Sequence, residues 1–193
     1  MRIRYNAPVT LTYTFLSAIV LGLSLTVFPS LTALAFSTPA PFRSNMFGDY
    51  LKLFTHIAGH ASIDHYISNF TMVLLLGPIL ENAYGSLRIL GMMAITALVT
   101  GLLNVFIFPG TVLMGASGVV FMMIMLSSIT NFRKGEIPLT FILVMIVFLG
   151  GEIWKAVAVK DNVSQFTHII GGLVGSFFGF IKPRSGREVD NVR

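Results

Sequence analysis

Residues 165–181 read QFTHIIGGLVGSFFGFI, an apolar segment in which His168 is followed by Gly171, Gly175 and Gly179. In a helix these four positions share one face, because residues three and four apart lie above one another. Small residues at this spacing let a second helix approach closely, so simple helix packing can explain the glycines. A histidine inside a membrane segment is costly and must find partners, which makes His168 a candidate functional residue.

Composition assigns the chain to the membrane proteins. Of its 193 residues, 54% are hydrophobic and 11% are charged, whereas a soluble domain has about 25% charged residues. The chain has no cysteine, which excludes disulfides, cysteine-ligated zinc and a thiol nucleophile. The net charge of +5 does not indicate nucleic-acid binding, because basic residues of membrane proteins mainly mark cytoplasmic loops and tails.

Six apolar segments approach the length of ~20 residues that a spanning helix needs. They are Val9–Phe28, Asp64–Leu80, Leu87–Phe108, Gly115–Asn131, Ile137–Val157 and Gln165–Ile181, of which the second, fourth and sixth are shorter and more polar. We therefore expect an all-α bundle of six transmembrane helices, with one membrane domain at residues 1–182 and a charged tail at 183–193. The first segment could instead be a secretory signal cleaved near Ala33–Ala35, but its apolar run is longer than a signal core.

The distribution of basic residues predicts the orientation. With the N-terminus in the cytoplasm, nine of the thirteen Lys and Arg residues fall on the cytoplasmic side and four on the opposite side. An excess of basic residues marks cytoplasmic loops. Both termini are therefore expected in the cytoplasm.

This topology brings polar residues of three segments to one depth. The second, fourth and sixth helices all begin at the outer face, near His65 and Asn69, near Ser117 and near His168. Ser117 lies in the sequence Gly115-Ala116-Ser117-Gly118, where a serine by itself is usually a packing residue. Close packing of the fourth and sixth helices would bring His168 to the distance of about 2.6–3.2 Å at which a base activates a nucleophile.

A second polar cluster, HIAGHASIDHYISN, occupies residues 56–69. His65 and Asn69 share a helix face and offer hydrogen-bond donors without a net charge, which suits an oxyanion hole. The alternative is a metal site, although the spacing fits no tight zinc signature and His-Glu-x-x-His is absent. Its ligands would be His56, His60, Asp64 and His65. For His56 and His60 a third interpretation stays open, in which polar groups only satisfy one another.

The first loop carries Phe47, Tyr50, Leu51 and Phe54 at three- and four-residue spacing. This pattern predicts an amphipathic helix lying in the outer membrane interface, or a loop packed on the bundle.

Three motifs together resemble the rhomboid intramembrane serine proteases of the minimal six-helix type. The first runs from Thr55-His56 through His60 to His65-x-x-x-Asn69. The second is Gly77-x-x-x-Glu81-x-x-x-Gly85, and the third pairs Gly115-x-Ser117-Gly118 with His168-x-x-Gly171-x-x-x-Gly175. Each motif is weak alone, whereas their joint order is specific.

The resemblance implies a catalytic dyad of Ser117 as nucleophile and His168 as general base, without an acidic third member. It implies an oxyanion hole formed by His65, Asn69 and the Ser117 backbone amide. It also implies that His60 helps to retain water and that Glu81 anchors the cytoplasmic end of the second helix. The supporting positions in these motifs are Gly115, Gly118, Phe121, Gly171 and Gly175.

The same resemblance implies an endopeptidase that cuts membrane proteins, mainly those with a single span, near the outer face of the bilayer. It implies no metal, no other cofactor and no nucleic-acid partner. The minimal form fits a multi-pass protein of a bacterial cytoplasmic (inner) membrane.

Two positions depart from the family pattern. The aromatic–arginine pair of the first loop falls at Leu51-Lys52, and a frequent tyrosine is Phe121, which supplies no hydroxyl beside His168. Two other function classes stay open. One is a rhomboid-like binding or quality-control protein without catalytic activity, and the other is a transporter or channel whose polar residues line a pathway.

Overall fold

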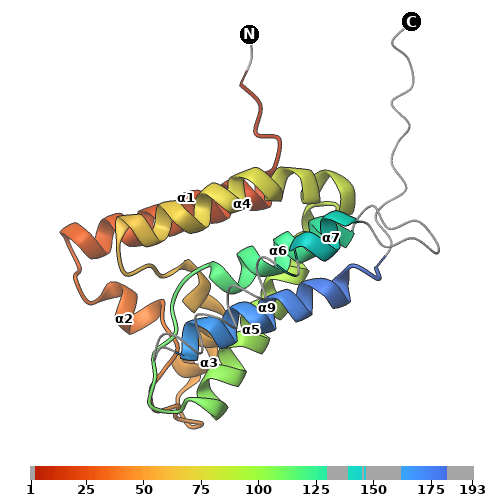
Figure 1. The fold of residues 1–193 in the computed structure, drawn as a ribbon. Helices are drawn as coiled ribbons and strands as arrows, with labels where there is room; N and C mark the ends of the chain where they lie inside the picture. The colour runs from red at the N-terminus through yellow and green to blue at the C-terminus, as the bar shows by residue number, and fades with distance from the viewer. Residues whose placement is uncertain (1–2, 130–138, 145, 147–161, 182–193) are drawn as a thin grey trace, which may run out of the picture.

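The computed structural model describes residues 3–129, 139–144, 146 and 162–181. Within these ranges the regular elements are all helical (Figure 1). In chain order they are α1 (Pro8–Thr26), α2 (Leu31–Ala35), α3 (Phe47–Thr55), the 3-10 helix η1 (His56–Ala58), α4 (Ile63–Tyr84), α5 (Ser86–Ile107), α6 (Ser117–Ile129), α7 (Leu139–Val144) and α9 (Asn162–Phe178). The expected fifth span lies mostly outside the described residues, as do Arg133, Lys134 and the tail from residue 182 onward.

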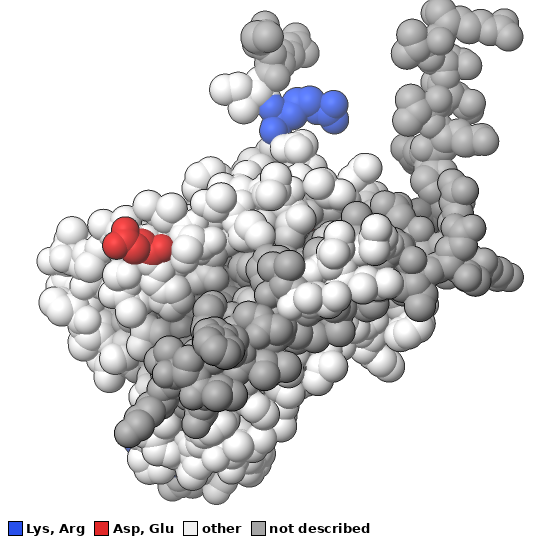
Figure 2. Space-filling model, in the orientation of Figure 1, with Lys and Arg blue, Asp and Glu red and all other residues white. Residues whose placement is uncertain are grey.

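Three of the described helices are long and apolar enough to cross a membrane, namely α1, α4 and α5. The helices α6 and α9 are apolar but shorter. The space-filling view shows a described surface that is almost entirely uncharged (Figure 2). On the face shown, the charged side chains that stand out lie near the N-terminus and at one end of the α1–α4 pair. The chain is therefore a helical membrane protein.

The prediction of a short second helix is wrong. The helix α4 has 22 residues and continues past Leu80 to Tyr84, with Pro78 inside it. A proline removes one backbone hydrogen bond, but membrane helices tolerate this because neighbouring groups satisfy the freed carbonyl. Beyond Pro78, Leu80, Glu81 and Tyr84 are all buried, so packing stabilises the last turn of this helix.

Two local signals set the ends of α4. Ser62 caps its N-terminus, where the hydroxyl accepts a hydrogen bond from the His65 backbone N–H at 3.1 Å. Gly85 ends the helix with φ 86°, a conformation that glycine adopts without strain. The next helix begins at Ser86, so the break expected over residues 81–88 consists of one residue.

A buried carboxylate joins α1 to α4, which lie side by side (Figure 1). Glu81 accepts hydrogen bonds from the Thr10 backbone N–H at 2.6 Å and from the Thr10 and Ser86 hydroxyls at 2.7 Å each. Thr10 lies in the first turn of α1, where backbone N–H groups have no partner within the helix. Glu81 therefore ties the start of α1 to the end of α4.

The helices α6 and α9 form the most extensive helix pair among the described elements (Figure 1). A Cβ atom at Gly171 would collide with the carbonyl group of Gly118, and one at Gly175 would lie 2.7 Å from the Met122 Cα. A Cβ atom at Gly179 would meet the side chain of Ile129. The close approach expected from the glycine spacing is therefore present, and it sets α9 directly against the start of α6.

Candidate active site

Four residues singled out in the sequence line one cavity of about 220 Å³. His65 and Asn69 reach it from the first turns of α4, Ser117 from the start of α6, and His168 from α9. The remaining lining residues are Ser68, Leu113 and Met114. Side chains from three separate helices thus meet where their helices begin or make their first turns.

The segment before Ser117 is fixed by the residues it packs against. Gly115 has φ 125°, and a Cβ atom there would lie 2.8 Å from the Nε2 atom of His65. The Gly115 backbone N–H donates to the carbonyl of His56 at 3.0 Å. The Ala116 N–H donates to Nε2 of His60 at 3.3 Å. His56 and His60, from the polar cluster of residues 56–69, therefore hold the two residues that precede Ser117.

His168 packs against Phe121 in a parallel arrangement. Their ring centroids are 4.4 Å apart, and the ring planes differ by 7°. Phe121 follows Ser117 by one helical turn, so the stack places the imidazole on the face of α6 that carries Ser117. The aromatic ring at position 121 thus orients His168 by stacking, without a hydroxyl.

His65 and Asn69 supply hydrogen-bond donors beside Ser117. The Asn69 side-chain amide donates one hydrogen to the His65 carbonyl at 3.0 Å. An amide NH₂ group has two hydrogens, so a second donor is available. Asn69 is buried and its neighbour His65 is half-buried, which limits competition from water.

His60 is buried and does not line the cavity. Its ring lies 5.0 Å from that of His65, measured between centroids. Burial, with a smaller effect from His65, lowers the pKa of His60 from 6.5 to about 4. His60 is therefore neutral near pH 7, as it must be to accept the hydrogen bond from Ala116.

His56 is also buried and has its own partners. Its Nδ1 atom lies 3.2 Å from the Lys52 carbonyl, and its Nε2 atom lies 3.4 Å from the Thr100 hydroxyl. Burial lowers the pKa of His56 to about 4. Among the described residues, no group of three histidine or carboxylate side chains is arranged to hold a metal ion. The alternative metal interpretation of this cluster gains no support from its geometry.

An ion pair that sequence analysis missed fixes the first loop. The Asp49 carboxylate accepts hydrogen bonds from Nε and Nη2 of Arg43 at 2.9 Å each, and Nζ of Lys52 lies 3.6 Å away. The Arg43 hydrogen bonds lower the pKa of Asp49 to about 2. Lys52 thus contributes to a loop anchor, but the arginine stands earlier in the chain than the family pattern suggests. The opposite charges of Arg43 and Asp49 in an apolar chain were the available signal.

The amphipathic helix predicted for the first loop is present as α3. Its large apolar side chains Phe47, Tyr50, Leu51 and Phe54 are all exposed. Asp49 and Leu53, on the other face, are buried. An exposed apolar face of this kind suits a helix that lies in a membrane interface.

The protein is a helical membrane protein with a cavity lined by Ser117 and His168. Comparison with known families identifies the family to which it belongs. The family model described as Rhomboid domain matches residues 47–185. The chain belongs to the rhomboid family.

Two curated relatives agree with this assignment. The chain is 32% identical over 152 residues to Rhomboid-related protein 1 of Caenorhabditis elegans, covering 72% of this chain and 42% of the relative. It is 30% identical over 143 residues to Rhomboid-related protein 2 of Mus musculus, covering 67% of this chain and 47% of the relative. The chain thus spans about half the length of these relatives.

Proposed function

We propose that the protein is an intramembrane serine endopeptidase that cleaves membrane proteins through Ser117 and His168. The observation that carries the proposal is the cavity that Ser117, His168, His65 and Asn69 line together. Membership of the rhomboid family supports the same chemistry.

In the proposed reaction the Ser117 Oγ attacks the carbonyl carbon of a substrate peptide bond, while His168 accepts the hydroxyl proton. His168 then gives this proton to the departing amine, and an acyl ester stays on Ser117. A water molecule attacks the ester, again with His168 as base, and the carboxylic acid product leaves. The developing negative charge on the carbonyl oxygen falls beside the donors of His65, Asn69 and the Ser117 amide.

The backbone contacts before Ser117 support its role as a positioned nucleophile. Donors act best when they are fixed before the reaction begins. The hydrogen bonds from Gly115 to His56 and from Ala116 to His60 fix this backbone. We therefore assign His60 a positioning role, and the water retention expected from the family resemblance stays a prediction. We assign Glu81 a structural role, in which it connects α1 to α4.

We further propose a single membrane domain of six spans, with both termini in the cytoplasm and the catalytic cavity toward the outer face. The proposed substrates are single-span proteins with small or helix-breaking residues at the cut site, because a helix must unwind to expose a carbonyl. A bacterial cytoplasmic membrane stays a prediction, and the worm and mouse relatives give it no support.

The proposal is tested with the purified protein in liposomes that contain a single-span substrate. The variant Ser117→Ala should abolish cleavage and labelling by a fluorophosphonate, whereas Ser68→Ala, from the same cavity, should keep both. Loss of a catalytic serine typically removes about 10⁶-fold in kcat. Cleavage by Ser117→Ala at an undiminished rate would refute the assignment.

Two further outcomes point to the other function classes. If the wild type neither cleaves any membrane substrate nor reacts with the fluorophosphonate, the protein is a rhomboid-like binding protein. Flux of a solute through the same liposomes in the absence of cleavage indicates a transporter or channel.

A further inference from the structure

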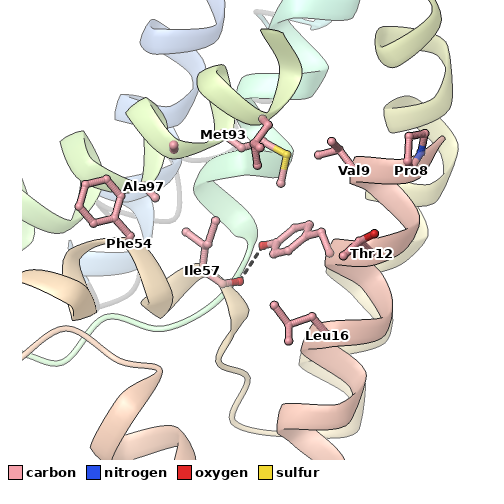
Figure 3. Close-up of a pocket in the computed structure, with 11 residues that line it drawn as sticks. Pro8, Val9, Thr12, Leu16, Phe54, Ile57, Met93 and Ala97 are labelled. Carbon is pink, nitrogen blue, oxygen red and sulfur yellow. Dashed lines mark hydrogen bonds between the residues drawn. The ribbon is translucent and has the colours of Figure 1, made fainter. Parts of the chain in front are cut away.

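A second cavity, of about 440 Å³, lies between α1, α5 and the junction of α3 with η1 (Figure 3). It shares no lining residue with the cavity of Ser117. Buried Tyr13, Met93 and Ala97 contribute to its wall. At its rim, Leu16 and Leu90 are 48% and 50% exposed, so the cavity opens onto the apolar surface of the bundle.

The polar side chains of this cavity already have partners. The Tyr13 hydroxyl donates to the Ile57 carbonyl at 2.7 Å (Figure 3). The Thr12 hydroxyl lies 3.0 Å from the hydroxyl of Tyr5. A buried water needs about two to four polar partners, whereas apolar cavities stay dry and accept hydrocarbon. The chemistry of the walls therefore favours a hydrocarbon occupant.

The shape of the cavity matches a chain that runs along the helices. Its lining on α1 extends from Pro8 to Leu16 and on α5 from Leu90 to Ala97, which at 1.5 Å per residue correspond to about 12 Å and about 10 Å. One leaflet of the hydrocarbon core is about 15 Å thick. Both helices are long and apolar enough to cross the membrane, so the surrounding medium consists of acyl chains.

We propose that this cavity binds one acyl chain of a membrane phospholipid, inserted between α1 and α5 and against Ile57. The site is independent of the proposed protease activity.

Photo-methionine incorporated into the full chain tests the proposal, because Met93 lines the cavity whereas its neighbour Met92 does not. Both side chains are buried. After illumination in vesicles of phosphatidylethanolamine and phosphatidylglycerol, we expect a phospholipid adduct on Met93 and none on Met92. The variant Ala94→Phe fills the cavity and should remove the adduct. Ile95→Phe adds bulk at an exposed position outside the cavity and should leave the adduct unchanged.

A measurement on the unchanged protein guards against a variant that fails to fold. In vesicles of phospholipid with deuterated acyl chains, the Met93 adduct on the unchanged protein should gain the mass of the deuterium, which identifies the occupant as phospholipid. The absence of a lipid adduct in the first vesicles, or its persistence in Ala94→Phe, overturns the proposal. An adduct between Met93 and a peptide of a second copy overturns it as well, since another chain then occupies the cavity.

Discussion

The backbone conformation of Gly115 sets the direction in which the chain runs into Ser117, the proposed nucleophile. Its φ of 125° lies in a region that residues with a Cβ atom rarely adopt. The ring of His65 occupies the space where a Cβ atom would stand. A single glycine therefore lets the chain turn into α6 while the ring of His65 stays against the backbone.

The variant Gly115→Ala should lower kcat by about 10²-fold, the loss typical of one displaced oxyanion donor, because the new methyl group must push His65 away. The measurement is substrate cleavage in liposomes, with protein stability followed in parallel. Gly110→Ala is the control, since a Cβ atom at Gly110 meets no atom within 4 Å. Equal activity of the two variants would contradict the assigned position of His65.

The sequence predicted the residue types of the cavity better than their contacts. Ser117, His168, His65 and Asn69 stand at motif spacings, so they could be found without a structure. The hydrogen bond from Ala116 to His60 could not, because it depends on how two distant segments of the chain pack, which residue spacing does not encode. For the ion pair of Arg43 with Asp49, the opposite charges were a signal, but they did not give its geometry.

At the scale of helices, the packing of α9 on α6 rests on positions where no side chain fits. Gly171 faces the backbone of Gly118, and Gly175 faces that of Met122. The adjacent Gly172 differs, because a Cβ atom there would make an ordinary contact of 3.5 Å with the Met125 side chain. Replacing either glycine by alanine changes helix propensity equally, but only a Cβ atom at Gly171 would push the two helices apart. Comparing the two variants therefore isolates the contribution of close helix packing.

Gly171→Ala should destabilise the protein by about 1–3 kcal/mol, the usual cost of overpacking, and should reduce cleavage because α9 carries His168. Gly172→Ala should keep activity and stability near the wild type. Thermal unfolding in detergent, together with substrate cleavage, measures both effects. The idea fails if Gly172→Ala is the more damaging of the two.

Helix existence was easier to predict than helix length. Apolar runs indicated α1, α4 and α5, since a spanning segment has to be apolar throughout. The end of α4 was misplaced because Pro78 and the polar residues from Glu81 onward suggest a break. Burial of Glu81 and the hydrogen bonds it accepts from Thr10 and Ser86 stabilise the added turn, and Thr10 comes from a distant part of the chain.

At the scale of the whole molecule, buried neutral histidines tie stability to pH. His56 and His60 have their pKa lowered from 6.5 to about 4 by burial. Between these two values the unfolded chain binds protons that the folded chain does not, so acid favours unfolding. Asp49, with a pKa lowered from 3.8 to about 2, loses its stabilising charge as the pH falls through that lower range.

The free energy of unfolding should therefore fall as the pH is lowered from about 6.5 to about 4. The slope should be at most ~1.4 kcal/mol per pH unit for each histidine. His60→Gln keeps a hydrogen-bond acceptor and removes one titrating group, so it should reduce the slope. Thermal unfolding across this pH range gives the comparison. If His60→Gln has the same dependence of unfolding free energy on pH as the wild type, the pKa of His60 is the same in the folded and unfolded chain, and the prediction is wrong.

The joint at Gly85 has a consequence for how this molecule tolerates changes in chain length. One residue separates α4 from α5, so no loop can absorb an added residue there. An α-helix turns by about 100° per residue, and an insertion would rotate one helix against the other by about that angle. Met93 and Ala97 of α5, which are buried, would then point away from their present packing partners. Insertions and deletions during evolution should therefore be excluded from this joint.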